Sequence, residues 1–452
     1  MTLDDPIIDA RDSQVKTTQN IGAGAKPSVT GASMTDAQDW TKFAEGAEIL
    51  TSENIGKVVK GLPLKARLAL TGLLQMQHGT LSIELPDGRK VIIKGRTTGP
   101  EAAVRLRNWN LASRALMTGT IGVAETYMDG DWDSPDIVAF LKLFLVNGDA
   151  ADRYANGTGS LMKLAEKIRH WLRGNSKAGS KRNISAHYDL GNDFYKAWLD
   201  PSMTYSSALY STGANDLQSA QNAKYRALAE ATGIMPGDHV LEIGCGWGGF
   251  AEFAASEMGC RVTGLTISRE QLAFAQERIR KAGLSDRVDF RFQDYRDETG
   301  VYDKIISIEM FEAVGEKYWP TYFAKLKECL KPGGRAGLQI ITIKAESFAK
   351  YKANPDFIQK YVFPGGMLPT PEHLQALSRK ADLSMVKDFG FGLDYARTLA
   401  EWRDRFWMAW ERVKPLGFDD RFKRLWDFYL YYCEAGFLSR NIDVRQVVFA
   451  RA

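Results

Sequence analysis

Residues 240–249 (VLEIGCGWGG) decide the fold of this chain. The first four residues are typical of a buried strand, and they run directly into glycines that precede a segment with helical periodicity. Gly244 and Gly246 allow a tight backbone turn and let a ligand approach without meeting a Cβ atom. Because the first N–H groups of a helix have no partner within the helix, this junction indicates a nucleotide-binding turn.

The position of the nearby acid distinguishes two kinds of nucleotide-binding turn. A dinucleotide-binding turn has an acid about twenty residues after the glycines, where it holds a ribose. Here the second strand ends in residues 264–268 (GLTIS), which contain no acid. Instead, Glu242 stands two residues before Gly244, an arrangement typical of S-adenosylmethionine-dependent methyltransferases. We therefore predict a methyltransferase rather than a dehydrogenase.

Strands and helices alternate around this turn. Strand-like runs occur at 239–243, 261–266, 288–292, 304–308, 336–343 and 444–450. Helical periodicity occurs at 248–257, 269–282, 318–330, 397–413 and 420–438. Such alternation produces a mostly parallel sheet covered on both faces. We predict that residues 183–452 form an α/β domain of the class I S-adenosylmethionine-dependent methyltransferase type, which is Rossmann-like with a seven-stranded sheet.

The chain before this domain has a different pattern. Residues 1–40 are polar and without a sustained period, so we expect a disordered tail there. Residues 79–94 alternate between apolar and polar around an Asp-Gly turn and predict a β-hairpin. Helices are expected at 102–118 and 135–146. These elements predict a small α+β N-terminal domain at 41–150.

Residues 151–182 are predicted to form a basic amphipathic linker containing one helix. Apolar residues recur there at helical spacing, and Glu166 is the single acid among several lysines and arginines. A basic helix that carries Trp171 can lie on an anionic membrane surface. It can equally pack on the neighbouring domain with its basic face in solvent, and the sequence leaves both interpretations open.

Composition excludes several classes of function. The formal net charge is only +4, so we expect no nucleic-acid partner. The four cysteines have no CxxC spacing, and we expect neither a metal site nor a disulfide framework. No run of eighteen apolar residues occurs, and residues 1–10 do not resemble a secretory signal. We expect a cytoplasmic protein that can still contact the inner membrane surface.

Six ordered motifs carry a resemblance to a known family. Together they resemble the cyclopropane-fatty-acyl-phospholipid synthases and the related mycolic-acid methyltransferases over about 183–452. The region 45–150 is similar to the N-terminal domain of longer bacterial members. The motifs are residues 187–195 (HYDLGNDFY), 203–208 (MTYSSA), 240–249, 264–271 (GLTISREQ), 308–315 (IEMFEAVG) and the pair 361–366 (YVFPGG) and 429–437 (YLYYCEAGF).

The resemblance implies a reaction and its components. Such enzymes transfer the methyl group of S-adenosylmethionine to a cis double bond in a phospholipid acyl chain, and loss of a proton from the resulting carbocation closes a cyclopropane. It also implies a homodimer peripherally associated with the membrane. The cofactor positions map to Tyr205, Ser206, Gly244, Gly246, Thr266, Gln271, Asp294 and Tyr295. Of these, Asp294 and Tyr295 also follow the third strand, at the end of the sheet that faces the adenine in this fold.

Family members hold a bicarbonate ion as the base, and its ligands map to Ser207, Glu312, Ile341 and Tyr395. The family usually has Cys at the position of Ser207 and His at the position of Ile341. Gln339 lies two residues before Ile341 on the same strand and therefore faces the same side of the sheet. We hypothesise that Gln339 supplies the donor that Ile341 lacks, and we place Glu312, Tyr395, Ser207 and Gln339 in the catalytic set.

A carbocation mechanism requires a site that excludes water, and aromatic faces also stabilise cations. Aromatic residues are frequent after residue 350; we expect most of them in the core and a minority along an acyl tunnel. The departures at Ser207 and Ile341 keep open a second product, a methylene- or methyl-branched chain formed from the same cation. Two further alternatives are a methyltransferase for a small amine or another lipid, and a lipid-binding protein without catalysis.

Overall fold

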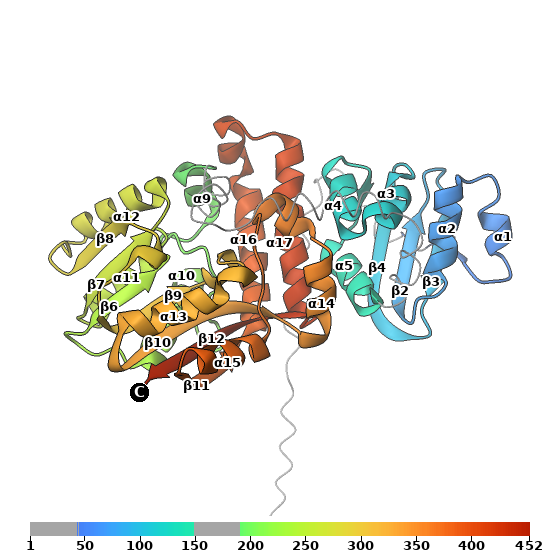
Figure 1. Cartoon of the computed structure of the whole chain (residues 1–452). Helices are drawn as coiled ribbons and strands as arrows, with labels where there is room; N and C mark the ends of the chain where they lie inside the picture. The colour runs from blue at the N-terminus through green and yellow to red at the C-terminus, as the bar shows by residue number, and fades with distance from the viewer. Residues whose placement is uncertain (1–42, 44, 149–189) are drawn as a thin grey trace, which may run out of the picture.

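The computed structural model describes residue 43 and residues 45–148 and 190–452. The expected tail at 1–40 and the expected linker at 151–182 lie outside the described residues. The described part contains a five-stranded sheet near its beginning and a seven-stranded sheet in its second half. Two long helices, α16 (Gly392–Val413) and α17 (Asp420–Leu438), stand between the two sheets (Figure 1).

The seven-stranded sheet has the order β11-β12-β10-β9-β6-β7-β8. The strands from β10 to β8 run parallel, and β12 is antiparallel to both β10 and β11. This arrangement confirms the predicted α/β class and the mostly parallel sheet of seven strands. The strands are β6 His239–Ile243, β7 Arg261–Thr266, β8 Val288–Phe292, β9 Tyr302–Ile308, β10 Leu330–Ile343, β11 Leu383–Gly390 and β12 Ile442–Arg451.

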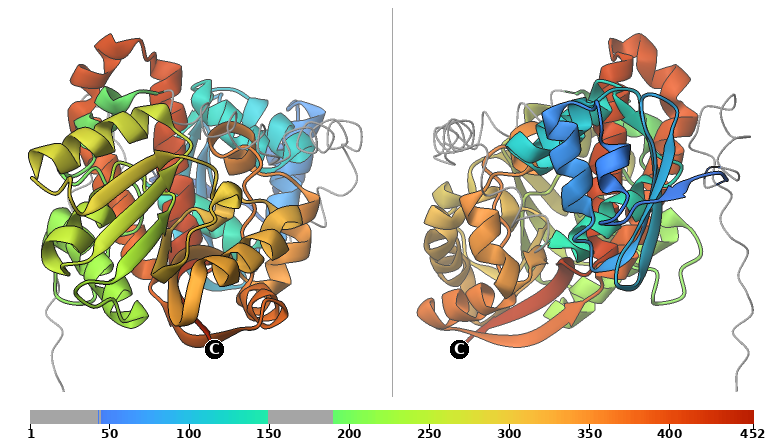
Figure 2. Two further views of the ribbon diagram at one scale, coloured as in Figure 1. Left: turned by 60° about the vertical axis from the view of Figure 1, so that its left-hand side comes forward. Right: turned by 90° about the vertical axis from the view of Figure 1, so that its right-hand side faces the viewer.

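The C-terminal sheet buries apolar side chains on both faces. Val240 and Val262 belong to one hydrophobic cluster, whereas the next residue of β6, Leu241, belongs to another together with Leu265. Successive side chains of a strand point to opposite faces, so the two clusters are the cores above and below the sheet. Helices cover both faces (Figures 1 and 2). They are α10 Leu217–Thr232, α11 Gly249–Glu257, α12 Arg269–Lys281, α13 Trp319–Cys329 and α15 Pro371–Lys380, whereas α9 Asn192–Trp198 packs against α16.

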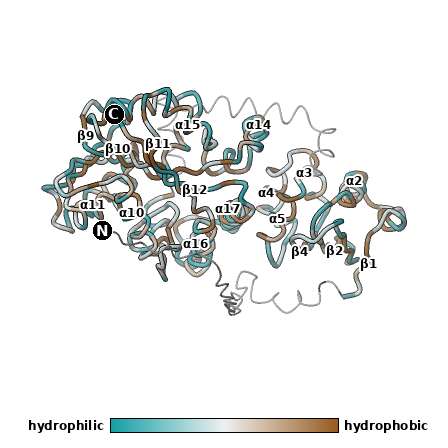
Figure 3. Tube along the Cα trace, turned by 90° about the horizontal axis from the view of Figure 1, so that it is seen from below, coloured by the Kyte–Doolittle hydropathy of each residue, from teal (hydrophilic) through white to brown (hydrophobic). Residues whose placement is uncertain are grey.

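The short helix α14 (Ala345–Ala353) follows β10 and differs from the helices that cover the sheet. It is mostly hydrophilic in Figure 3, and none of its side chains is buried. In the described ranges, no helix is both long enough and apolar enough to cross a membrane.

The five-stranded sheet has the order β1-β3-β2-β4-β5. Strands β2 and β3 pair antiparallel, as the predicted hairpin at 79–94 requires. Helix α5 confirms the helix expected at 135–146. The elements are β1 Glu48–Ile49, α1 Ile55–Val58, α2 Leu64–Leu73, β2 His78–Glu84, β3 Lys90–Lys94, β4 Thr97–Leu106, α3 Asn110–Thr118, α4 Thr120–Met128, β5 Trp132–Asp133 and α5 Ile137–Val146.

The helix predicted at 102–118 is wrong in its first part. Residues up to Leu106 belong to strand β4, which pairs parallel with β2, and only α3 is helical. Ala102, Val104 and Leu106 are buried, while the residues between them are not. This is the two-residue period of a strand, and alanine and arginine, which favour helices, obscured it.

Helix α17 joins the two halves of the molecule. The hydroxyl of Tyr127 on α4 donates to Oδ2 of Asp427 on α17 at 2.8 Å, and both side chains are buried. The guanidinium of Arg424 on α17 donates to Asp133 at 2.9 Å. Glu125 accepts a hydrogen bond from the hydroxyl of Tyr361 at 2.6 Å. These contacts fix the N-terminal sheet against the helices of the C-terminal half.

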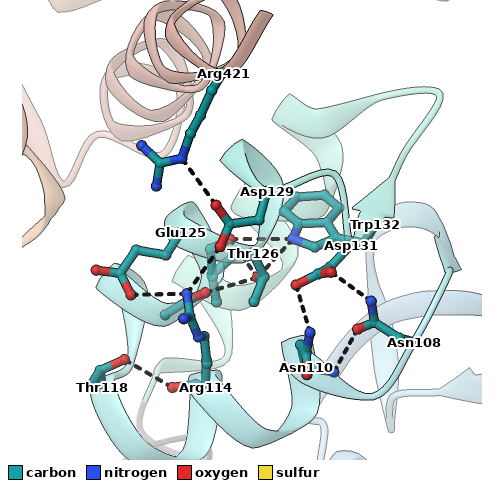
Figure 4. A network of polar contacts seen from close by, with 12 residues as sticks. Asn108, Asn110, Arg114, Thr118, Glu125, Thr126, Asp129, Asp131, Trp132 and Arg421 are labelled. Carbon is teal, nitrogen blue, oxygen red and sulfur yellow. Dashed lines mark hydrogen bonds and ion pairs between the residues drawn. The ribbon is translucent and has the colours of Figure 1, made fainter.

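The rim of the contact between the two halves is more exposed to solvent than the buried pair of Tyr127 and Asp427. Arg421 of α17 donates to Asp129 at 3.1 Å, and Arg114 contacts both Asp129 and Glu125 (Figure 4). The side chain of Arg421 is 51% exposed, so water competes with this ion pair.

Candidate active site

The glycine turn has the conformation that the sequence predicts. Gly244 and Gly246 have φ values of +83° and +53°, a region that side chains other than glycine rarely adopt. A Cβ atom on Gly244 would lie 2.7 Å from Cγ of Met310. A Cβ atom on Gly246 would meet nothing within 4 Å. The turn is therefore tight at its first glycine and open toward a cavity at its second.

This cavity has a volume of about 1600 Å³. Ligand pockets for small molecules are usually about 300–1000 Å³, so there is room here for more than one ligand. All the predicted cofactor residues line it: Tyr205, Ser206, Gly244, Gly246, Thr266, Gln271, Asp294 and Tyr295. They come from the carboxyl ends of β6, β7 and β8 and from the segment before α10, the edge at which open α/β sheets bind ligands.

Several of these residues hold one another in place. The hydroxyl of Thr266 donates to Oε1 of Gln271 at 3.0 Å, and both are buried. Asp294 accepts from the backbone and the guanidinium of Arg296, which fixes the carboxylate beside the cavity. The hydroxyl of Tyr205 donates to that of Tyr429 on α17 at 2.8 Å.

Two buried ionisable groups lie next to the cofactor residues. Glu242 is buried and one of its carboxylate oxygens, Oε2, has no hydrogen-bond partner within the described chain. Burial raises the pKa of Glu242, and the charges of Lys224 and Arg278 oppose this. Lys224 donates to the hydroxyl of Ser206 at 2.7 Å, and burial lowers its pKa to about 7. The sequence does not predict a buried Lys224, because a lysine in an amphipathic helix is normally exposed.

The strongest polar cluster centres on Glu309, which follows β9. Its Oε1 atom accepts from the backbone N–H of Ser207 and from Nε2 of Gln339, each at 2.8 Å. Its Oε2 atom accepts from the hydroxyl of Tyr395 at 2.6 Å. Glu309 lines the cavity and has a φ of +50°. Such strained backbone persists where surrounding contacts determine it, and it concentrates at functional sites.

The structure thus brings three of the four predicted catalytic residues to one carboxylate that was not predicted. Ser207 contributes its backbone N–H, whereas its hydroxyl donates to the carbonyl of Ala208 at 3.0 Å. At Ile341, where the resemblance implies a ligand, β10 has no polar side chain, and the polar side chain that β10 contributes to this cluster is that of Gln339. Ile341 lines the cavity and uses its backbone N–H to donate to Glu312.

Glu312, the fourth predicted catalytic residue, lies next to this cluster. Burial raises the pKa of Glu312 to about 8, and the negative charge of Glu309 adds to the effect. Its Oε2 atom has no hydrogen-bond partner among the residues that the structure describes. Burial also raises the pKa of Glu309, but Tyr395, Lys224, Gln339 and the backbone of Ser207 oppose that rise. Of the two neighbouring carboxyl groups at the cavity, Glu309 therefore has more donors that favour the charged form than Glu312 has.

Glu309 was missed although it belongs to a quoted motif, residues 308–315. Two carboxylates three residues apart at the carboxyl end of a parallel strand were a signal that could have identified it.

The rest of the cavity is mostly apolar and comes from both halves of the molecule. The C-terminal half supplies α17 residues and the N-terminal half supplies residues of its sheet and helices. The first group includes Phe428, Tyr432, Cys433 and Phe437, and the second includes Leu73, Ile83, Val104, Leu106, Phe140 and Phe144. Lys350 and Glu346 of the polar helix α14 also line it.

The strand order and the glycine turn define this protein as a class I S-adenosylmethionine-dependent methyltransferase by fold. Residues 175–447 match the family model described as mycolic acid cyclopropane synthetase. This match covers more than half of the chain, and the chain belongs to that family.

Curated relatives agree with this assignment. The chain is 39% identical over 358 residues to the cyclopropane-fatty-acyl-phospholipid synthase of Escherichia coli, covering 77% of this chain and 88% of that protein. It is 37% identical over 360 residues to the tuberculostearic acid methyltransferase UfaA1 of Mycobacterium tuberculosis, covering 75% and 81%. Both alignments are longer than the region 183–452, so the similarity extends into the N-terminal half.

Two solved structures resemble the C-terminal half. The cyclopropane synthase MmaA2 of Mycobacterium tuberculosis has a TM-score of 0.56 and 28% identity, covering 60% of this chain and 98% of that one. The mycolic acid cyclopropane synthase CmaA1, complexed with SAH and CTAB, has a TM-score of 0.56 and 27% identity with the same coverage.

Proposed function

We propose that this chain transfers a methylene group from S-adenosylmethionine to the cis double bond of an unsaturated phospholipid acyl chain and forms a cyclopropane. The observation that carries the proposal is one continuous cavity that joins the glycine turn, the two carboxylates and an extensive apolar lining. The cavity has room for a nucleoside and for an acyl chain that lies along the apolar side. The names of the relatives, which include a cyclopropane synthase of phospholipids, support the same reaction.

The residues at the glycine turn fit S-adenosylmethionine. The unpartnered carboxylate oxygen of Glu242 and the open space above Gly246 suit a polar ligand that approaches the backbone closely. We propose that Glu242, with the eight predicted cofactor residues, holds the cofactor, which supplies an electrophilic methyl group on sulfur. The chain itself has to align an alkene with that methyl group, and such positioning can contribute about 7–11 kcal/mol.

The apolar side of the cavity fits the acceptor. An alkene is a weak nucleophile, and water would trap the cation that forms from it. Aromatic and aliphatic side chains such as Tyr432 and Phe437 exclude water, and aromatic faces stabilise positive charge. Because the N-terminal half supplies part of this wall, we propose that it helps to receive the acyl chain.

The proposal extends to where the enzyme works. A phospholipid substrate lies in a bilayer, so we propose that the protein associates peripherally with the cytoplasmic membrane surface. Flotation with anionic vesicles measures this association. The homodimer that the resemblance implies is measured by analytical ultracentrifugation.

The function is tested by incubating the full chain with S-adenosylmethionine and vesicles of phospholipid with cis-monounsaturated chains. Released acyl chains are analysed by gas chromatography with mass spectrometry and by proton NMR. We expect a mass gain of one CH₂ and high-field ring protons. No gain of mass, with the cofactor shown to bind, would contradict the proposal.

A second product is supported by one comparison. The similarity to the tuberculostearic acid methyltransferase of Mycobacterium tuberculosis is almost as high as that to the cyclopropane synthase. The alternative is therefore a methylene- or methyl-branched acyl chain formed from the same cation. A methylene branch has the same mass as a ring, but its olefinic protons distinguish it in the NMR spectrum.

A further inference from the structure

Glu309 occupies the place at which the resemblance to the family implies a bicarbonate ion. The donors expected to hold the ion are those of Ser207, Gln339 and Tyr395, and all three point at the Glu309 carboxylate instead. A carboxylate is a planar anion with two oxygen acceptors, as bicarbonate is. The residues present therefore do not fit an additional bicarbonate at these donors, because the side chain already uses them.

We propose that Glu309 is the catalytic base of this enzyme and that the protein needs no bicarbonate. The inference rests on the proposed function, since it concerns the step that removes a proton from the cationic acyl chain. In relatives, a bound bicarbonate ion is expected to remove this proton. Here we assign the removal of the proton to the side chain of Glu309.

The surroundings favour the ionised form of the Glu309 carboxylate although it is buried. Each of its oxygens accepts at least one hydrogen bond, and three donors stabilise the charged form. The buried Lys224 contributes a positive charge that lowers the pKa of Glu309. A carboxylate has about four lone-pair positions, and the three donors occupy three of them. The remaining position can accept a proton from a substrate in the cavity, because Glu309 lines that cavity.

Glu312 completes the arrangement as the partner that holds a proton. Two neighbouring carboxylates in a buried site do not both ionise, and their pKa values separate. Glu309 has three stabilising donors, whereas Glu312 accepts from the backbone of Ile341 and has an unpartnered Oε2 in the described chain. The negative charge therefore resides on Glu309, where the reaction needs it.

The step balances in atoms and charge. After methyl transfer, the acyl chain carries one positive charge next to the carbon that received the methyl group. Glu309 takes one proton from that methyl group, and the electron pair of the broken C–H bond forms the C–C bond that closes the ring. The chain becomes neutral, Glu309 becomes a carboxylic acid, and it later gives the proton to water.

The backbone at Glu309 favours this role over that of a structural acid. Residues other than glycine rarely adopt a φ of +50°, and the conformation directs the side chain toward donors from β10, α16 and the segment before α10. An acid that only paired with a neighbour would not need donors from three distant parts of the chain.

The first test measures binding of bicarbonate without turnover. Carbon-13-labelled bicarbonate is titrated by NMR into CO₂-depleted wild-type protein, into Glu309→Gly and into Glu309→Gln. We expect binding only to Glu309→Gly, which frees the three donors and suits the positive φ. Binding to the wild type that is lost in Tyr395→Phe would overturn the proposal, whatever the outcome of the lipid assay.

The second test measures turnover in CO₂-depleted buffer. We expect the wild type to be fully active without bicarbonate and Glu309→Gln to lose about 10²–10⁴-fold in kcat, the usual contribution of a general base. S-adenosylhomocysteine should bind Glu309→Gln as it binds the wild type, which shows that the isosteric variant is folded. Millimolar bicarbonate should restore part of the activity to Glu309→Gly and none to Glu309→Gln.

A matched control is Glu316→Gln, which changes an acid on the following turn that pairs with Lys352 at the surface. It should leave kcat unchanged. A wild type that loses activity on removal of CO₂, or a Glu309→Gln variant with full kcat, would show that another base acts. If no lipid tested is methylated, the proposed function fails, and the binding titration alone still decides whether Glu309 fills the anion site.

Discussion

The two polar ends of the cavity are built in different ways. At the cofactor end, Glu242, Gly244 and Gly246 lie within five consecutive residues, and the turn forms because of local backbone requirements. At the carboxylate end, Glu309 is held by donors from residues 207, 339 and 395, which only the complete fold brings together. A change of backbone at the glycine turn should therefore strongly weaken cofactor binding. At the carboxylate end, removal of one donor should lower kcat only in part, because the other donors remain.

Apart from the Glu309 variants, the largest effect is expected at the cofactor end. Gly244→Ala places a Cβ atom 2.7 Å from Met310 Cγ at a φ of +83°. Backbone strain of about 1–3 kcal/mol plus this overlap should weaken S-adenosylhomocysteine binding about 100-fold. Isothermal titration calorimetry measures the Kd.

Gly237→Ala is the matched control for this substitution. Gly237 has a φ of +88° with nothing within 4 Å of an added Cβ atom, and it does not line the cavity. Its substitution should lower the melting temperature but leave the Kd unchanged. Equal Kd values for both variants would mean that the glycine turn does not hold the cofactor.

A smaller effect is expected when one donor is removed at the carboxylate end. Tyr395→Phe deletes the hydroxyl that donates to Glu309 at 2.6 Å. Hydrogen bonds to charged groups contribute about 1.5–3 kcal/mol, so kcat should fall about 10- to 100-fold while S-adenosylhomocysteine still binds. Because this hydrogen bond lowers the pKa of Glu309, its loss should shift the acidic limb of the kcat profile to higher pH.

Tyr302→Phe serves as the control for this change, since Tyr302 also donates to a glutamate, Glu298, at 3.1 Å but away from the cavity. It should leave both kcat and its pH profile unchanged. If the pH profile of kcat is not shifted in Tyr395→Phe, the hydroxyl of Tyr395 does not affect the pKa of Glu309.

The sequence predicted the local end of the site and most of the fold. Hydrophobic periodicity and glycine positions depend only on residues close together in the sequence. They therefore predict the strand and helix around Gly244 and most of the long helices α16 and α17. The alanines and arginines of strand β4 favour helices, so the sequence predicts a helix where the structure has a strand. Strand alternation predicts that Gln339 faces the same side of the sheet as Ile341, and the structure places Gln339 in the polar cluster around Glu309.

The remainder depended on contacts that no local pattern encodes. Glu309 becomes significant only when Ser207, Gln339 and Tyr395 converge on it. The buried Lys224 and the joining of the two halves by Tyr127 and Asp427 likewise depend on residues far apart in the sequence.

Glu312 at the carboxylate end makes the stability of the folded protein depend on pH. Its pKa in the folded state is about 8, above the ordinary value of 4.5. Between these values the unfolded chain releases a proton that the folded chain keeps, so stability is lost as pH rises from about 4.5 to about 8.

Glu312→Gln removes this titration. Its free energy of unfolding should therefore rise relative to the wild type as pH increases, by on the order of 1–3 kcal/mol between pH 5.5 and pH 7.5. Urea denaturation at the two pH values measures the difference. Glu316→Gln should show no such trend, and a constant difference between Glu312→Gln and wild type would mean that Glu312 is ionised in the folded protein.

The smallest effect is expected at the rim of the contact between the two halves, which touches neither polar end of the cavity. Arg421 and Asp129 form an ion pair at 3.1 Å, with Arg421 51% exposed (Figure 4). Exposed pairs contribute about 0–1 kcal/mol, so Arg421→Ala should change the free energy of unfolding by no more than that and leave kcat unchanged. Asp427→Ala, which leaves the buried hydroxyl of Tyr127 without its acceptor, should cost more, about 1–3 kcal/mol. If Arg421→Ala instead reduced kcat strongly, the rim would help to shape the cavity, and the carboxylate end would depend on the N-terminal half as well as on its own three donors.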